Sequence, residues 1–165
     1  MADSKPIAYL ETTFVSYLTS RPSRDLVVAA HQEVTREWWD ERRGDYHLIT
    51  SQLVLSEASA GDSEAAKRRL DVLQSVELVA ITAGARDLAR ALLAAHVVPS
   101  TAAEDALHIA IAAESGANYL ITWNCKHIAH AAMRGSIEDV CRRAGMEPPA
   151  LCTPLELLEE LDDGT

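Results

Sequence analysis

Several residue types are scarce in this chain, and each scarcity argues against a class of protein. The three cysteines, Cys125, Cys141 and Cys152, are odd in number and widely spaced, which suits reduced thiols in a cytoplasmic protein better than a disulfide framework. The seven glycines are scattered, so no Gly-rich loop is present to cradle a phosphate. No apolar run approaches the roughly 20 residues of a membrane helix, and the first residues lack the basic and apolar regions of a signal peptide. We therefore expect a cytoplasmic protein without a membrane partner.

Basic residues are also in deficit. Fifteen lysines and arginines face 25 aspartates and glutamates, which gives a formal net charge of −10. Such a charge argues against a protein that coats nucleic acid electrostatically. It leaves open a nucleic-acid substrate held through metal ions, and it suits a basic protein partner.

Apolar residues, in contrast, are plentiful. They make up 48% of the 165 residues, enough for one domain with a full hydrophobic core. The chain contains no internal repeat, low-complexity tract or linker. We expect a single domain over residues 1–165.

Short apolar runs of strand type alternate with segments of helical periodicity along the chain. The predicted strands are residues 5–10, 47–50, 77–81, 119–122 and 151–152. The predicted helices are residues 12–18 with Thr12 or Thr13 as cap, 25–43, 52–60, 63–74, 82–95, 101–115, 131–144 and 154–161. This alternation predicts an α/β fold, a three-layer α/β/α sandwich around a mainly parallel sheet of four or five strands.

The stretch 101–127 organises the predicted site. Thr101 and Glu104 have the spacing of a capping box at the start of a helix, and Gly116 is placed to end it. A helix that feeds a parallel strand usually runs antiparallel to it. The first helical turn, with Asp105, should then lie at the carboxyl edge of the sheet, where Asn124 also emerges. Ligands of open α/β sheets bind at that edge.

Two further acidic residues are predicted at the same edge. Glu11 directly follows the first strand, and Glu57 lies in the second turn of the helix that leaves the second strand. Each residue alone has an ordinary alternative: Glu11 as a helix cap, Glu57 on a solvated face, Asn124 in a turn, and the nearby His108 as a hydrogen-bonded core residue. Together, three carboxylates and an amide offer hard oxygen ligands, which point to Mg²⁺ or Mn²⁺.

Four segments resemble the PIN domain, and in particular the VapC-type toxins of bacterial toxin–antitoxin pairs. They are YLETT at 9–13, TSQLVLSEASAGD at 50–62, EDALHIAIAA at 104–113 and YLITWNCKHIAHA at 119–131. The resemblance implies a metal-dependent endoribonuclease that hydrolyses RNA with a metal-activated water. It implies that Glu11, Glu57 and Asp105 hold Mg²⁺ or Mn²⁺, with Asn124 at the fourth catalytic position.

The same resemblance implies two protein partners. One is an antitoxin whose tail, often carrying Arg, occupies the acidic cleft. The other is a second copy of the chain in a homodimer. Trp38, Trp39 and the amphipathic C-terminal helix offer apolar surface for such contacts, and burial in the core is the alternative interpretation.

Two departures from the family pattern support a different function. Glu11 stands where Asp is usual, and Asn124 stands where Asp is common. A longer side chain and a lost charge would weaken metal binding, so the alternative is a PIN-fold RNA- or protein-binding module with weak or no catalysis. A third interpretation, an aspartyl phosphoacceptor domain of the flavodoxin-like type, ranks last because Glu11 is a poor acceptor and Lys126 lacks a matching acidic pair.

Overall fold

A five-stranded sheet forms the centre of the protein, whose computed structural model describes residues 4–162 and the side chains of 4–158. All strand pairs are parallel, and the strand order is β3-β2-β1-β4-β5. The strands are β1 (Ile7–Leu10), β2 (His47–Ser51), β3 (Glu77–Val79), β4 (Tyr119–Ile121) and β5 (Ala150–Cys152). The predicted parallel α/β sheet is confirmed.

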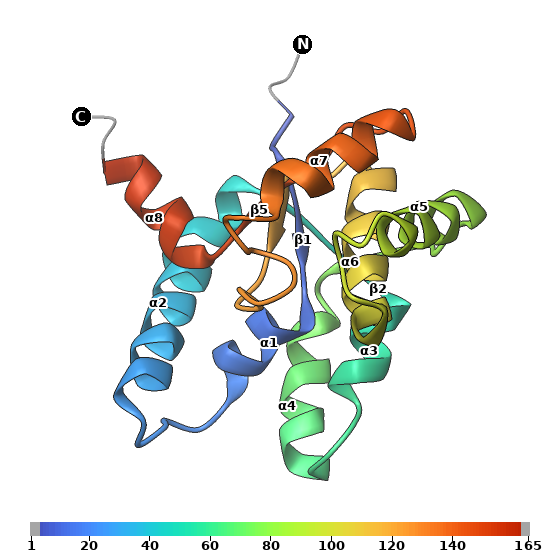
Figure 1. Ribbon diagram of the computed structural model, residues 1–165. Coiled ribbons are helices and arrows are strands. Elements are labelled where there is room, and N and C mark those ends of the chain that lie inside the picture. Colours follow the sequence, from blue (N-terminus) through green and yellow to red (C-terminus); the bar gives the residue numbers. More distant parts are fainter. Residues whose placement is uncertain (1–3, 163–165) are drawn as a thin grey trace.

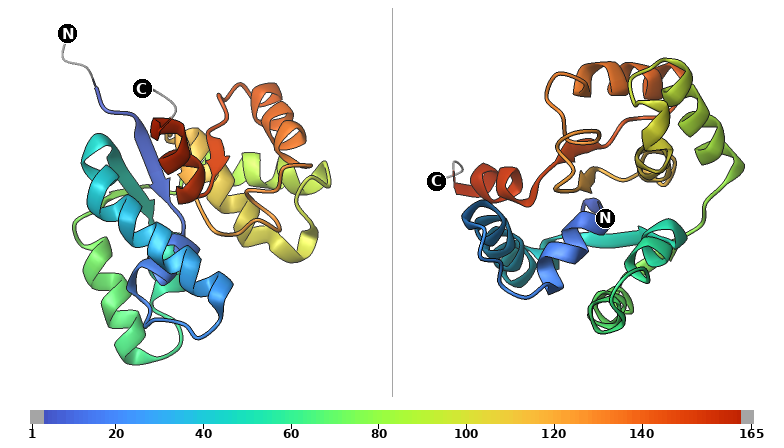
Figure 2. Two further views of the ribbon diagram at one scale, coloured as in Figure 1. Left: turned by 90° about the vertical axis from the view of Figure 1, so that its left-hand side faces the viewer. Right: turned by 60° about the horizontal axis from the view of Figure 1, so that its bottom comes forward.

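Helices cover both faces of this sheet (Figure 1). They are α1 (Thr12–Thr19), α2 (Leu26–Arg42), α3 (Gln52–Ala58), α4 (Ser63–Leu73), α5 (Ala83–Ala94), α6 (Ala103–Glu114), α7 (Arg134–Arg143) and α8 (Pro154–Asp162). Helix α5 packs against α6 and α7, while α2 packs against α1 and α8, so the two groups form separate layers (Figure 2). The three-layer arrangement agrees with the prediction.

The central strand β1 brings the predicted site residues to one edge. Ala8, Tyr9 and Leu10 are fully buried, as expected for a strand covered on both faces. Strand β1 pairs with β2 on one side and with β4 on the other. The chain therefore changes direction across the sheet between β1 and β4. In α/β sheets, ligands bind at the carboxyl end of the strands at such a switch point.

The start of α6 differs from the prediction. Residues Ser100–Ala102 form a short 3-10 helix, α6 begins at Ala103, and its N-cap, Ala102, makes no side-chain cap hydrogen bond. The prediction that Thr101 and Glu104 form a capping box is therefore wrong. The 3-10 turn enters the helix through backbone geometry alone, and the carboxylate of Glu104 is left for other contacts.

The start of α1 also differs. Its N-cap is Glu11, whose side chain accepts the N–H of Thr13, and neither Thr12 nor Thr13 acts as the cap. Asp25, Asp62 and Thr82 are the N-caps of α2, α4 and α5, and each side chain accepts a backbone N–H of the first turn. Other differences are confined to element ends. The helix predicted from residue 131 begins at Arg134, for instance, and the strand predicted to residue 81 ends at Val79.

Helix α6 ends at Glu114 with Ser115 as its C-cap, and the predicted terminating glycine, Gly116, follows. This residue has φ +75°, its N–H donates to Ala113 O, and Ala117 N–H donates to Ala112 O, which is the Schellman pattern. Gly116→Ala is expected to lower the free energy of unfolding by about 1–2 kcal/mol, which is the cost of placing an L-amino acid in the left-handed backbone conformation. Gly135→Ala in α7 is the control, because its φ is not positive and an added Cβ meets no atom within 4 Å. Urea denaturation of both variants checks the difference, and equal stability would contradict it.

Trp38 belongs to the core. Its ring is fully buried, edge-on to Phe14 at 5.5 Å and 5.2 Å from Tyr46. Trp39 is partly buried and packs against the same core. Helix α8 packs on α2, as Figure 1 shows at the left of the molecule, and its Leu157 and Leu158 are buried. The core interpretation of these residues therefore holds.

None of the helices within residues 4–162 is long and apolar enough to cross a membrane.

Candidate active site

Glu11 lies at the switch point, directly after β1. Its backbone N–H donates to Ile121 O of β4, and its side chain is 3% exposed. The Oε2 atom accepts hydrogen bonds from Thr13 N at 2.9 Å, Thr13 Oγ1 at 2.5 Å and Thr122 Oγ1 at 2.9 Å. Burial nevertheless raises the pKa of Glu11, because it outweighs the opposing effects of His108 and these donors. A nearby cation would offset the cost of burying this charge.

Glu57 is held by two donors from other elements. Its Oε1 accepts a hydrogen bond from Thr12 Oγ1 at 2.5 Å and contacts Nε2 of His108 at 2.7 Å. Burial alone would raise the pKa of Glu57, but the hydrogen bond and charge of His108, with the bond from Thr12, lower it to about 2. Glu57 is therefore ionised at neutral pH.

His108 is buried and contacts the site at the same time. It is completely buried in α6, and its Nδ1 lies 2.9 Å from the hydroxyl of Tyr9, which lies 2.8 Å from Ser51 Oγ. The sequence interpretation favoured a core histidine, which is correct but incomplete. The available signal was its position one helical turn after Asp105.

Asp105 meets the loop that follows β4, as predicted. Its Oδ2 lies 3.0 Å from Nδ1 of His127. Asn124 lies in the same loop, but its Oδ1 accepts the N–H of His127 at 3.0 Å. Its own N–H donates to Thr122 Oγ1 at 2.9 Å. The amide oxygen of Asn124 thus shapes the turn, which is the ordinary alternative for this residue.

Glu104 is an acidic neighbour that the sequence analysis missed. A hydrogen bond with Glu57 and the charge of Glu57 raise the pKa of Glu104. The capping-box pattern had assigned its carboxylate to the helix start and so concealed this contact. Glu104 and Asp105 also line a pocket of about 370 Å³ at the start of α6.

The donor chemistry of this edge fits a hard divalent ion. Carboxylates and hydroxyls of Glu11, Glu57, Asp105, Thr12 and Thr13 are oxygen donors, the type that Mg²⁺ and Mn²⁺ prefer. Among the described residues, no three His, Cys, Asp or Glu side chains converge to hold an ion by themselves. Mg²⁺ is commonly bound by one or two carboxylates, with water and substrate phosphate completing its shell. These residues suit that hydrated mode of binding.

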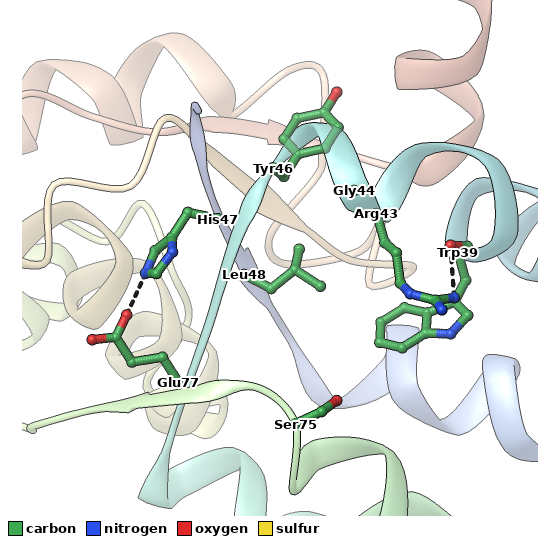
Figure 3. Close-up of a pocket in the computed structure, with 8 residues that line it drawn as sticks. All are labelled: Trp39, Arg43, Gly44, Tyr46, His47, Leu48, Ser75 and Glu77. Atoms are coloured by element: carbon green, nitrogen blue, oxygen red, sulfur yellow. Dashed lines mark hydrogen bonds and ion pairs between the residues drawn. The ribbon is translucent and has the colours of Figure 1, made fainter. Parts of the chain in front are cut away.

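A different pocket, of about 390 Å³, lies at the opposite edge of the sheet (Figure 3). It is lined in part by His47 and Glu77, the first residues of β2 and β3, which form a hydrogen bond. On its other side the guanidinium of Arg43 lies over the ring of Trp39 at 4.9 Å (Figure 3). It includes none of the candidate site residues.

Comparisons with known proteins agree with this fold. VapC20 of Mycobacterium tuberculosis, a sarcin–ricin loop cleaving toxin, is 18% identical with a TM-score of 0.58, covering 73% of this chain and 92% of that chain. VapBC2 of Rickettsia felis, solved bound to a DNA fragment from its promoter, is 19% identical with a TM-score of 0.54, covering 73% and 89%. No curated protein matches significantly. The PIN domain family model matches residues 8–132, well over half of the sequence, and the chain belongs to the PIN domain family.

Proposed function

We propose that this protein is a metal-dependent endoribonuclease and the toxin of a toxin–antitoxin pair. One observation carries the proposal: Glu11, Glu57 and Asp105 come from remote segments and all lie at the carboxyl edge of one parallel sheet, each in a network of hydrogen bonds. Membership of the PIN family supports it. The likeness to VapC20, a toxin that cleaves the sarcin–ricin loop, supports a cleavage reaction.

The side chains have separate roles in this proposal. Glu11, Asp105 and Glu57 would hold Mg²⁺ or Mn²⁺, directly or through water. When bound, the ion lowers the pKa of a water and neutralises charge that develops on the phosphoryl oxygens. Glu57, fixed at Oε1, orients the attacking water. Asn124 holds the turn that carries His127, and His127 in turn fixes one oxygen of Asp105.

Asp105→Asn tests this assignment. We expect RNA cleavage with Mn²⁺ or Mg²⁺ to fall by about 100-fold or more, because the loss of about 3 kcal/mol of charge stabilisation corresponds to that factor. Asp87→Asn, in the exposed ion pair of α5, makes the same change of net charge and is the control. The measurement is the rate of fragment formation from labelled RNA. Equal rates for the wild type and Asp105→Asn would refute the enzyme assignment.

Two observations favour the second candidate, a PIN-fold RNA- or protein-binding module with little catalysis. The Oδ1 of Asn124 is engaged by the backbone, and the Oε2 of Glu11 already accepts three hydrogen bonds. The same assay separates the candidates. The binding module would be established if the wild type binds RNA with the same affinity with and without Mn²⁺ and does not cleave it.

The proposal includes protein partners and a cytoplasmic setting. A chain with a net charge of −10 suits an antitoxin with a basic tail, and the VapBC2 neighbour was solved bound to its promoter DNA. We expect expression of this chain alone to arrest growth, and co-expression with such an antitoxin to restore it. We also propose a homodimer, which light scattering of the purified chain tests.

A further inference from the structure

A buried row of side chains connects the sheet to Glu57. Ser51 Oγ, Tyr9 Oη and His108 Nδ1 follow one another at 2.8 and 2.9 Å. His108 Nε2 then meets Glu57 Oε1 at 2.7 Å, and Thr12 Oγ1 donates to the same oxygen at 2.5 Å. The five residues come from five elements: β2, β1, α6, α3 and α1. Ser51, Tyr9 and His108 are fully buried, so water does not compete for these contacts.

The direction of the hydrogen bonds is fixed at Glu57. A carboxylate oxygen accepts hydrogen bonds, so Nε2 of His108 is the donor in its 2.7 Å contact with Glu57 Oε1. At the other end of the ring, Nδ1 meets the hydroxyl of Tyr9, which can donate or accept, and Ser51 can do either as well. The contact between His108 and Glu57 therefore persists whichever way the two hydroxyls are oriented.

Packing alone does not account for this arrangement. The rings of Tyr9 and His108 meet edge-on with centroids 5.9 Å apart, a contact that two apolar rings would also make. A buried phenol and a buried imidazole cost free energy unless every polar atom finds a partner. Here the hydrogen bonds of Tyr9 and His108 offset that cost, and the last of them is made to Glu57, a carboxylate of the proposed active site.

We propose that His108 and Tyr9 are positioning residues for Glu57. The hydroxyl of Tyr9 holds the ring of His108, and the ring holds Oε1 of Glu57 together with Thr12. The carboxylate is thereby held in one orientation, and Oε2 takes neither of these two bonds. This inference rests on the proposed ribonuclease function and adds two residues to its site.

Two amide variants of His108 separate positioning from structure. The side-chain nitrogen of Gln reaches about as far as Nε2, so His108→Gln keeps a donor for Glu57. That of Asn reaches only about as far as Nδ1, so His108→Asn loses the donor. We expect His108→Asn to lower kcat by about 10–100-fold, the usual range for outer-shell partners. We expect KM for RNA to stay within about threefold, and His108→Gln to recover most of kcat.

Mn²⁺ affinity, measured by electron paramagnetic resonance without RNA, provides a readout besides activity. It should weaken in His108→Asn and recover in His108→Gln, while both variants lose similar thermal stability. Suppose that the wild type is active and that His108→Asn and His108→Gln lose kcat and Mn²⁺ affinity to the same extent. That result would overturn the positioning role of His108 but not the ribonuclease proposal. A wild type that neither cleaves RNA nor binds Mn²⁺ would overturn the ribonuclease proposal and this inference with it.

Tyr9→Phe removes only the hydroxyl that meets Nδ1. We expect kcat to fall by about 3–10-fold with KM unchanged, which is less than for His108→Asn because the contact of His108 with Glu57 remains. Tyr17→Phe, on α1 and outside this row, is the control and should keep wild-type kinetics. If Tyr9→Phe and Tyr17→Phe behave alike, Tyr9 has no positioning role.

Discussion

Glu11→Gln is expected to make the protein more stable and catalytically inactive. Glu11 is 3% exposed, and burial raises its pKa above the ordinary value of 4.5, so the ionised form destabilises the fold. Glutamine keeps an oxygen that can accept from Thr13 and Thr122 but carries no charge. RNA cleavage should fall by about 100-fold or more, because about 3 kcal/mol of metal-dependent stabilisation is lost.

The size of this stability effect depends on pH. A carboxyl with a raised pKa in the folded state is protonated in both states well below 4.5, where it costs nothing. As pH rises past that value, the unfolded chain ionises first and the wild type loses stability. The Tm of Glu11→Gln should therefore exceed that of the wild type at pH 7, and the difference should vanish well below pH 4.5. Each kcal/mol corresponds to about 2–4 °C. Glu33→Gln, on the exposed face of α2, is the control. A lower Tm than the wild type at pH 7 would contradict the argument.

Trp38→Ala is expected to cause the largest loss of stability. The ring is fully buried between Phe14 and Tyr46, and truncation of such an aromatic side chain costs about 3–5 kcal/mol, because transfer and cavity effects add. For a domain of this size, Tm should fall by about 6–20 °C. Urea denaturation with an unchanged m-value measures the loss.

Trp39→Ala is the matched control for that variant. Trp39 neighbours Trp38 on α2 but is only partly buried, and Arg43 lies over its ring at 4.9 Å. It should cost clearly less than Trp38→Ala. Both variants should retain RNA cleavage at 25 °C while folded. A loss below about 1 kcal/mol for Trp38→Ala would mean that the cavity collapses or that Trp38 is not a core residue.

The fold could be predicted because local patterns and global topology agree. Apolar runs such as Ile7–Leu10, followed by amphipathic helices, allow little other than a parallel sheet covered on both faces. That topology alone placed Glu11 and Asp105 at one edge of the sheet. The strand ends were less accurate, because pairing partners decide where a strand stops.

The individual side-chain contacts of the site could not be predicted from local sequence patterns. Thr101 and Glu104 match a capping box in spacing, but the pattern carries no information about Glu57, which lies 47 residues before Glu104 and raises its pKa. His108 among apolar neighbours gives the pattern of a core residue, and only the tertiary structure shows which carboxylate its second nitrogen meets. For Asn124, only the tertiary structure shows that its Oδ1 accepts the backbone N–H of His127, and its catalytic role stays a prediction.

The central position of β1 has a consequence for synthesis on the ribosome. Leu10 pairs with Ile121, so one wall of the Glu11 site is missing until β4 has been translated and has docked beside β1. Asp105 likewise needs His127 from the loop beyond β4. A nascent or truncated chain that ends before β4 would already contain Glu11, Glu57 and Asp105, yet it would lack a finished site. Under the proposed ribonuclease function, cleavage would therefore begin only after His127, about three quarters of the way along the chain, has been synthesised.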